Sequence, residues 1–137
     1  MRLPDHLDDR AILAVMVEHA RNAFLLIGKG RRPVYANQAF LEMSGYSYDE
    51  WMALERTSPL TPERDQVETG NSLNSALQGD STGFRGRAVV RQDGSELWVE
   101  AAVTALPIAG EGFLLAEFRP PCGDPPDGAL PWRPANH

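Results

Sequence analysis

Near the start of the chain, apolar residues recur every three or four positions, which is the spacing of one face of an α-helix. The pattern runs over residues 8–21, and Asp8 or Asp9 can cap its first turn by accepting a backbone N–H. A helix with one apolar face must bury that face against its own sheet or against a partner. The face comprises Ile12, Val15, Met16 and His19.

Two short apolar runs, 23–27 and 33–36, flank a turn that contains glycine, which predicts a β-hairpin. Asn37 follows the second run and is a favoured cap for a short helix over residues 38–43. Gly45 suits the end of that helix, because glycine adopts positive φ without strain.

The middle of the chain predicts further short helices. Ser47 and Glu50 have the spacing of a capping box, which places a helix start at Ser47. In the region 55–79, Pro59 and Pro62 interrupt the pattern and apolar residues are sparse, and a helical stretch is predicted from Pro62 onward.

The second half of the chain changes to the two-residue period of β-strands. Residues 84–91, 96–106 and 113–118 form three such runs, and Asp93 and Gly94 lie in the hairpin turn between the first two. Strands at both ends with helices between them predict an α+β domain, with one antiparallel sheet and helices packed on one face.

This pattern divides the chain into three parts. Residues 1–22 are a flanking segment that contains the first helix, and residues 23–119 form the domain. Residues 120–137 include six prolines and little to bury, which predicts a flexible tail or linker.

Composition adds mainly exclusions. The chain has 137 residues, enough for one domain, and a net charge of −6 with scattered positive residues, which argues against nucleic-acid binding. No apolar run approaches the roughly 20 residues of a membrane span, and no signal-peptide core is visible, so we expect a cytoplasmic protein. Cys122 is the single cysteine, and no nucleophile–histidine or phosphate-cradling pattern occurs, so no enzymatic activity is expected.

Two motifs resemble the hallmarks of the PAS domain family. Residues 35–50, YANQAFLEMSGYSYDE, resemble the signature "yaNxaFxxxtGYsxxE", and residues 91–99, RQDGSELWV, resemble the second hallmark "rrkDGsxxwv". The resemblance covers about residues 23–118. It implies a five-stranded antiparallel sheet that cups a pocket against short helices, and a flanking helix that mediates dimers. We therefore expect a sensory module that binds an unidentified small molecule and signals as a homodimer.

The resemblance and the strand alternation together predict the pocket. Glu117 is its polar candidate, because flavin-binding PAS domains carry a pocket-facing glutamine at the corresponding place; a one-residue shift of register would put it in solvent instead. Asn37, Gly45, Asp93 and Gly94 are assigned structural roles. The predicted pocket residues are Leu26, Phe40, Gly86, Ala88, Leu97, Val99, Ala101, Val103, Leu115 and Glu117, and the predicted dimer interface consists of Ile12, Val15, Met16, His19 and Trp98.

The cofactors of PAS domains require particular residues. The light-sensing flavin branch has a reactive thiol where this chain has Arg56, which excludes the light-driven adduct. Haem-binding members usually take a histidine from the long helix, and residues 55–79 contain none, which argues against haem. Non-covalently bound flavin, as in redox-sensing members, is one alternative, and a ligand-free dimerisation module with a filled core is another. No metal site is predicted.

One departure from the family concerns the output. PAS domains that drive a downstream enzyme commonly continue from the last strand into a helix, but Pro120 and Pro121 stand there. Proline cannot continue a helix. The signal is therefore expected to leave through a linker, the first helix or the dimer interface, as in a transcription regulator or a stand-alone sensor.

Overall fold

The computed structural model describes residues 8–108 and 111–134 of the chain. Its helices are α1 (Asp9–Glu18), α2 (Gln38–Ser44), α3 (Tyr48–Met52) and α4 (Gln66–Leu77), with short 3-10 helices η1 (Lys29–Arg31), η2 (Ser58–Leu60) and η3 (Glu63–Asp65). Its strands are β1 (Ala23–Ile27), β2 (Pro33–Ala36), β3 (Arg85–Val90), β4 (Glu96–Ile108), β5 (Glu111–Arg119) and β6 (Leu130–Pro131).

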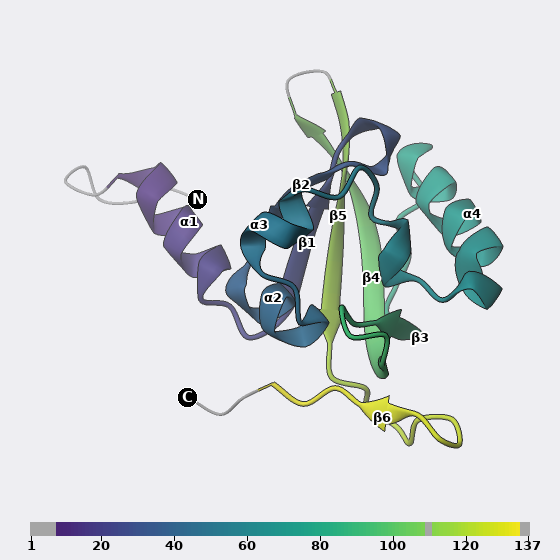
Figure 1. Cartoon of the computed structure of the whole chain (residues 1–137). Coiled ribbons are helices and arrows are strands. Elements are labelled where there is room, and N and C mark those ends of the chain that lie inside the picture. The colour runs from purple at the N-terminus through teal and green to yellow at the C-terminus, as the bar shows by residue number, and fades with distance from the viewer. Residues whose placement is uncertain (1–7, 109–110, 135–137) are drawn as a thin grey trace.

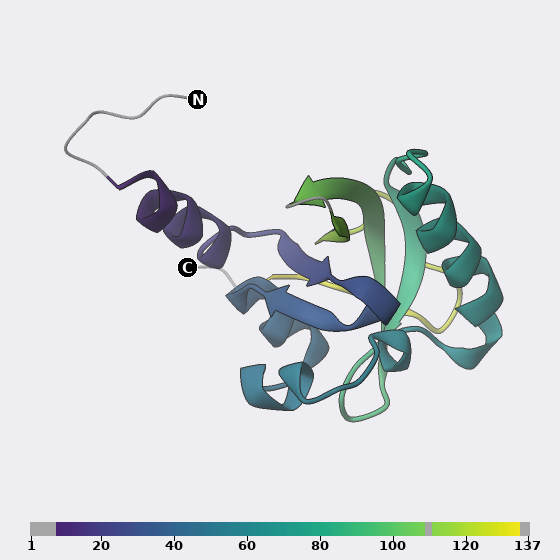
Figure 2. The same cartoon turned by 90° about the horizontal axis from the view of Figure 1, so that it is seen from above.

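The sheet has the order β2-β1-β5-β4-β3, and every neighbouring pair in it is antiparallel. Helices α2, α3 and α4 cover one face of this sheet, whereas α1 stands away from it (Figure 1). The view from above in Figure 2 shows the same separation of α1 from the body of the domain. The predicted α+β class with a five-stranded antiparallel sheet is confirmed.

The predicted helix caps are present. The side chain of Asn37 accepts the Phe40 N–H at 3.0 Å, and Gly45 ends α2 with φ at 77°. Ser47 and Glu50 form the reciprocal capping box at the start of α3, at 3.1 and 2.9 Å. These contacts span three residues or fewer, so the local sequence is sufficient to specify them.

Aromatic side chains fill the space between the sheet and α2 and α3. Phe40 and Trp51 are both completely buried, and their ring centroids lie 4.8 Å apart. Phe40 also contacts Phe118 of β5, with a centroid distance of 5.8 Å. Phe40 therefore packs in the core at this end of the sheet.

The inner face of β3 is the opposite of the predicted one. Arg87 pairs with Val99, and side chains of paired residues share a face, so the arginines of β3 point toward the helices. Gly86 and Ala88 lie on the outer face beside Trp98, where a Cβ on Gly86 would stand 2.6 Å from the Trp98 ring. The bulk of Trp98 requires a small neighbour on its own face, and this fixes the register.

The predicted faces of β1 and β5 are also wrong. Ala116 and Phe118 of β5 point inward, so Leu115 and Glu117 lie on the outer face, and Leu26 pairs with Leu115 there. Both strands carry apolar residues at odd and at even positions, and only the helices on one side decide which set is buried. The outer carboxylate accepts a hydrogen bond from the Asn22 side chain at 2.9 Å, so the alternative of a one-residue register shift is the correct one for Glu117.

The proline-rich segment, which the composition predicts to be a flexible tail or linker, packs against the domain over its described residues. The chain turns back after β5, and β6 pairs in parallel with residues 97 and 98 of β4. Trp132 donates its backbone N–H to Trp98 at 2.9 Å, and its side chain is 5% exposed within the main hydrophobic core. Residues 126–129 line a cavity of about 220 Å³ together with Trp98.

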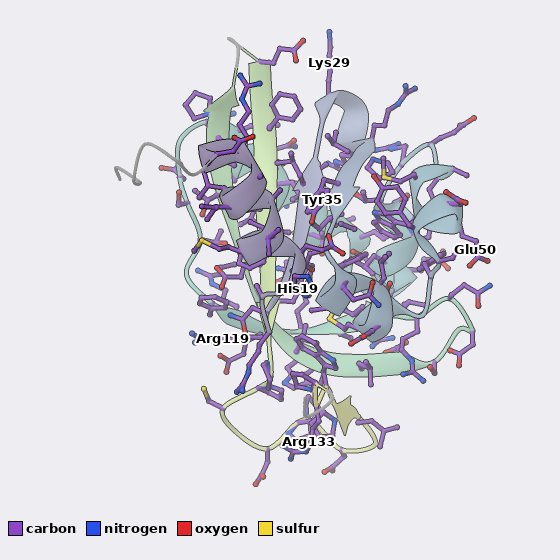
Figure 3. The ribbon with its side chains drawn as sticks, turned by 90° about the vertical axis from the view of Figure 1, so that its left-hand side faces the viewer. His19, Lys29, Tyr35, Glu50, Arg119 and Arg133 are labelled. Atoms are coloured by element: carbon purple, nitrogen blue, oxygen red, sulfur yellow. The ribbon has the colours of Figure 1, made fainter. Side chains whose placement is uncertain are left out.

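Helix α1 exposes most of its apolar side chains. Leu13, Val15, Met16 and Val17 are 45, 57, 57 and 37% exposed. The helix is held near its C-terminal end, where the Asn37 amide donates to the Val17 carbonyl at 2.8 Å and the Tyr35 hydroxyl donates to Glu18. Tyr35 and His19 are labelled in Figure 3, which looks onto the side from which α1 projects. Among the described residues, no helix has the length and apolarity needed to span a membrane.

Tyr35 supplies a test of this attachment. Partial burial, together with the hydrogen bond to Glu18, raises the pKa of the Tyr35 phenol above its usual value of about 10. The unfolded chain therefore loses this proton first, so stability is retained below about pH 10 and decreases as the pH rises further. The free energy of unfolding, measured in urea, should therefore decrease more steeply between about pH 10 and pH 12 for the wild type than for Tyr35→Phe. If the free energies of unfolding of the two proteins changed in parallel with pH, the raised pKa of the Tyr35 phenol would be contradicted.

Candidate functional site

A small cavity of about 50 Å³ lies between the inner face of the sheet and the η2–α4 region. About 10–15 Å³ of such space holds one water molecule, so the cavity has room for a few heavy atoms. Its floor is apolar, with Ala101 and Val103 of β4 and Ala116 and Phe118 of β5.

The wall of this cavity is polar, which the sequence analysis did not anticipate. Arg87 lies there and donates from Nη1 to the Thr69 hydroxyl of α4 at 2.8 Å. The Nε of Arg87 is buried and has no hydrogen-bond partner among the described residues. The other polar lining residues are Arg85, Thr57, Thr61, Ser72 and Thr82.

A second cavity of about 130 Å³ adjoins the first and shares Thr57, Thr61 and Thr69 with it. It adds two arginines, Arg31 and Arg56. Of the described residues that line either cavity, none is a carboxylate, a histidine or a cysteine. Together the cavities present an apolar floor and a mouth of hydroxyls and guanidinium groups.

The comparison with family models shows the family to which the chain belongs. The model described as "PAS domain" matches residues 11–77, which run from α1 to the end of α4. The chain belongs to the PAS domain family. A comparison with curated protein sequences found no significant match.

Solved structures support the fold. A domain of a sensory box sensor histidine kinase/response regulator from Geobacter sulfurreducens has a TM-score of 0.69 and 24% identity, covering 80% of this chain and 92% of that one. The PAS domain of nitrogen regulation protein NR(II) from Vibrio parahaemolyticus has a TM-score of 0.62 and 21% identity, with 79 and 96% coverage. An RNA-binding Light-Oxygen-Voltage receptor has a TM-score of 0.70 and 24% identity, covering 85% of this chain and 34% of that one.

The structure brings together only part of the predicted pocket of this PAS domain. Ala88, Ala101 and Val103 line the inner cavity, although Ala88 is an outer-face residue by its pairing. Leu97 and Val99 belong to the inner face but pack in the core. The others lie elsewhere: Phe40 in the aromatic core, and Leu26, Gly86, Leu115 and Glu117 on the outer face.

The sequence contained a signal for Arg85 and Arg87, the two pocket residues of β3 that the sequence analysis missed. Gly86 and Ala88 are the small residues of β3, and they were placed inward because a cavity also needs small residues. The bulky Trp98 directly across from Ala88 offered the alternative, in which the small residues make room for the indole. That assignment would have turned Arg85 and Arg87 toward the pocket.

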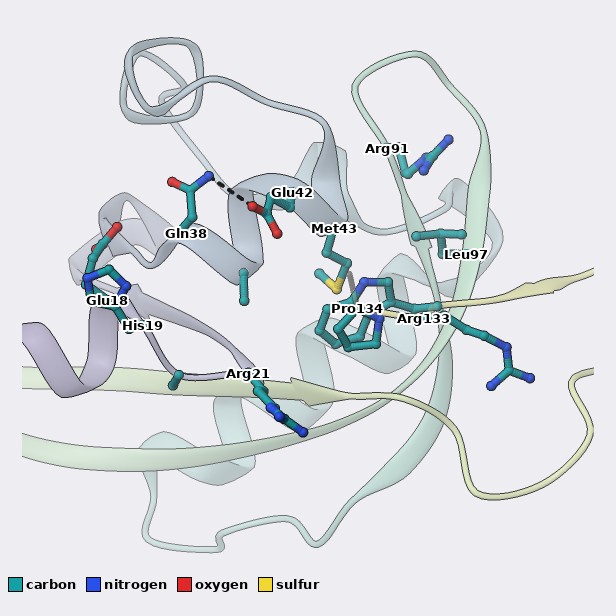
Figure 4. Close-up of a pocket in the computed structure, with 13 residues that line it drawn as sticks. Glu18, His19, Arg21, Gln38, Glu42, Met43, Arg91, Leu97, Arg133 and Pro134 are labelled. Carbon is teal, nitrogen blue, oxygen red and sulfur yellow. Dashed lines mark hydrogen bonds between the residues drawn. The ribbon is translucent and has the colours of Figure 1, made fainter. Parts of the chain in front are cut away.

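A larger groove of about 470 Å³ lies on another side of the PAS domain, between the end of α1, α2 and the C-terminal segment (Figure 4). Glu18 and Glu42 line it together with Arg21, Arg91 and Arg133, so charges of both signs face the same space. Gln38 donates to Glu42, one turn further along α2, at 3.3 Å. The groove thus combines acidic and basic groups, whereas the described lining of the two smaller cavities has arginines and no acid.

The residues assigned structural roles make the expected local contacts. Asn37 is fully buried, and Gly45 and Gly94 have φ values of 77° and 89°. Asp93 accepts the Ser95 backbone N–H at 2.9 Å in the β3–β4 turn, and the hydrogen bonds from Ser95 lower the pKa of this carboxyl group. Among the described residues, no three histidine, cysteine, aspartate or glutamate side chains are grouped to hold a metal ion.

Proposed function

We propose that this PAS domain is a cytoplasmic sensory module that binds a small ligand in its cup and signals through a homodimer. The exposed apolar surface of α1 carries the proposal. Four neighbouring apolar side chains of this helix stay 37–57% exposed, which is unusual for a helix that can reach a sheet of its own chain. Sensor histidine kinases are named among the proteins whose PAS domains have the same fold.

A second copy of the chain is the partner that fits this surface. The outer face of the sheet beside α1 carries Phe24, Leu26 and Leu115, all of them only partly buried. In a two-fold dimer, each α1 can cover the outer face of the other sheet, and the same patch then serves both copies. Apolar contact of this kind is stabilised by about 25 cal/mol for each Å² removed from water.

The dimer has a direct test. The double variant Val15→Asp/Met16→Asp places two charges on the exposed face of α1 and is expected to be a monomer, because burying an unpaired carboxylate in an apolar interface is unfavourable. Sedimentation equilibrium of the wild type and the variant measures this change.

The matched control is Val67→Asp, which introduces a carboxylate at an apolar residue of α4 that is 79% exposed and lies away from α1. It should dimerise like the wild type. A monomeric wild type at the highest accessible concentrations, or a dimer that survives both α1 substitutions, would contradict the proposal.

The cup supports the ligand-binding half of the proposal. Its lining includes no histidine, cysteine or carboxylate among the described residues, so we assign the domain no reaction of its own. A ligand between α4 and the sheet can shift the elements that hold α1, since Asn37 connects β1, α2 and the end of α1. The route of output is then the first helix and the dimer.

The ligand-free dimerisation module is a second candidate, favoured by the completely buried Phe40 and Trp51 and by the small size of the inner cavity. An absorbance spectrum and a native mass of freshly purified protein test the cofactor alternatives. A flavin band would favour the redox sensor. A colourless protein without added mass would leave the unliganded sensor and the dimerisation module, which the ligand titrations below separate.

A further inference from the structure

Four arginines from separate parts of the chain line the two adjoining cavities of the cup. Arg31 and Arg56 lie at the outer cavity, and Arg85 and Arg87 at the inner one. Within residues 8–108 and 111–134, no carboxylate lies within 4.0 Å of any of these guanidinium groups, although the chain as a whole has a net charge of −6. The described lining of the two cavities thus has four positive charges and no negative one, and the nearest acid by shared lining is Glu111, which lines a neighbouring groove with Arg31 and Arg56.

Other arginines nearby do have acidic partners. Arg64, in η3 at the start of α4, forms a two-pronged interaction with Glu96 of β4, and Arg119 contacts Glu100 at 2.9 Å. These pairs neutralise charge on the surface of the same sheet. Among the arginines that line the two cavities, Arg87 instead binds the hydroxyl group of Thr69, which does not neutralise its charge.

The surroundings of Arg87 favour binding of an anion. One nitrogen of its fork is already bound to the Thr69 hydroxyl, which fixes the orientation of the guanidinium. Its Nε is buried and has no acceptor in the part of the chain that the structure describes. A charged donor without an acceptor is costly in a low-dielectric site, and an oxyanion both accepts from it and offsets the charge.

The backbone conformation at Arg31 and at neighbouring Gly70 determines where the Arg31 side chain lies. This residue adopts a φ of +62°, which is uncommon for a residue other than glycine. Its carbonyl accepts the Thr57 N–H at 2.9 Å, and its guanidinium lies across Gly70 of α4, where a Cβ would stand 3.1 Å from Nη2. The missing side chain of Gly70 thus leaves room for the Arg31 side chain beside the outer cavity.

We propose that the cup of this PAS domain binds a compact organic carboxylate. The carboxylate group occupies the polar wall at Arg87 and its hydroxyl neighbours, and a short hydrocarbon body rests on Ala101 and Val103. The inner volume of about 50 Å³ limits this body to a few carbon atoms. The inference rests on the proposed ligand-sensing function and names the class of ligand for it.

The test is to titrate small molecules into the full chain at constant ionic strength. Isothermal calorimetry and thermal unfolding measure their binding. The probes are propionate, butyrate and succinate, with propionamide and butyramide as neutral counterparts of the same shape, and inorganic phosphate as an anion without a hydrocarbon body. We expect saturable binding of at least one carboxylate, weaker binding of phosphate, and no binding of the amides.

The Arg87→Met variant keeps the length and the apolar stem of the side chain but removes the fork, and it should weaken carboxylate binding about 10- to 100-fold. Arg64→Met is the matched control, because this arginine is exposed and paired with Glu96, and it should bind like the wild type. If Arg87→Met does not fold, Ala101→Leu fills the inner cavity while it leaves every charge in place, and it should abolish binding.

The outcomes separate the inference from the function on which it rests. Binding of the amides as tight as that of the acids, or full affinity in Arg87→Met, would overturn the carboxylate assignment and leave ligand sensing in place. Tighter binding of phosphate than of any carboxylate would overturn the proposed hydrocarbon contact. If no probe binds a protein that is dimeric, the carboxylate assignment is overturned and the ligand-free dimerisation module is favoured.

Discussion

Replacement of Asn37 by alanine is expected to destabilise the domain by about 3–5 kcal/mol, because one buried side chain satisfies four backbone groups. Its carbonyl oxygen accepts the N–H groups of Phe24 and Phe40 at 2.9 and 3.0 Å. Its amide donates to the carbonyls of Val17 and Asn22 at 2.8 and 3.1 Å. Alanine leaves all four without this partner at a residue that is fully buried.

The effect is large compared with the total stability of a small domain, which is about 5–15 kcal/mol. Urea unfolding followed by circular dichroism measures it, and hydrogen exchange should show faster exchange in α1, whose last turn loses its contact with Asn37. The substitution should therefore also destabilise α1, the helix that we propose as the dimer contact.

Two further variants define the origin of the loss. Asn37→Ser keeps an oxygen that can cap the Phe40 N–H without burying a charge but cannot reach the other three groups, so its free energy of unfolding should lie between those of the wild type and the alanine variant. Gln38→Ala changes the exposed next residue and should stay within about 0.5 kcal/mol of the wild type. An Asn37→Ala protein as stable as Gln38→Ala would show that the four contacts carry little energy.

Replacement of Trp132 by alanine is the second large effect, with an expected loss of about 3 kcal/mol. Its indole is 5% exposed and joins the core that contains Leu97 and Met43, while its backbone N–H binds Trp98. Without the indole, β6 is left with two backbone pairings and one mostly exposed side chain, Leu130. Residues 120–134 should then detach from the sheet and uncover Trp98.

Limited proteolysis tests this detachment together with thermal unfolding. The wild type should resist cleavage between Cys122 and Pro131, whereas Trp132→Ala should be cut there quickly, because proteases need a locally unfolded chain. Leu130→Ala is the control, since this side chain of the same strand is 65% exposed and its loss should cost less than about 0.5 kcal/mol. Rapid cleavage of the wild type in this segment would restore the flexible tail that the composition predicts.

Short-range features of this protein could be predicted from its sequence because their causes are local. The caps at Asn37 and Ser47, the glycine at the end of α2 and the turn at Asp93 and Gly94 depend on residues at most three positions apart. The inward set of β4 was also predictable, since Leu97, Val99, Ala101 and Val103 alternate with more polar or bulkier residues. Together with the two motifs, these features were sufficient for the PAS fold.

The candidate site was less predictable, because its main features depend on packing. Apolar residues at both parities of β1, β3 and β5 leave the face undecided, and a shift by one residue exchanges the whole pocket lining. Trp98 decides the face of β3, and it does so across the sheet. For this reason the sequence analysis named Glu117 as the polar candidate of the pocket and did not name Arg87, whereas in the structure Arg87 lines the inner cavity and Glu117 lies on the outer face.

Two further properties exist only in the tertiary structure. A proline-rich segment gains an ordered position because a single tryptophan, Trp132, finds a hydrophobic site next to α2, and composition averages do not detect one such anchor. The positive cup forms because the fold brings Arg31, Arg56 and Arg87 to the same two cavities from distant parts of the chain. The sequence thus determined the elements and the family, whereas packing of the sheet against α4 decided which charges meet, since electrostatic interactions depend on distance in space and not on separation along the chain.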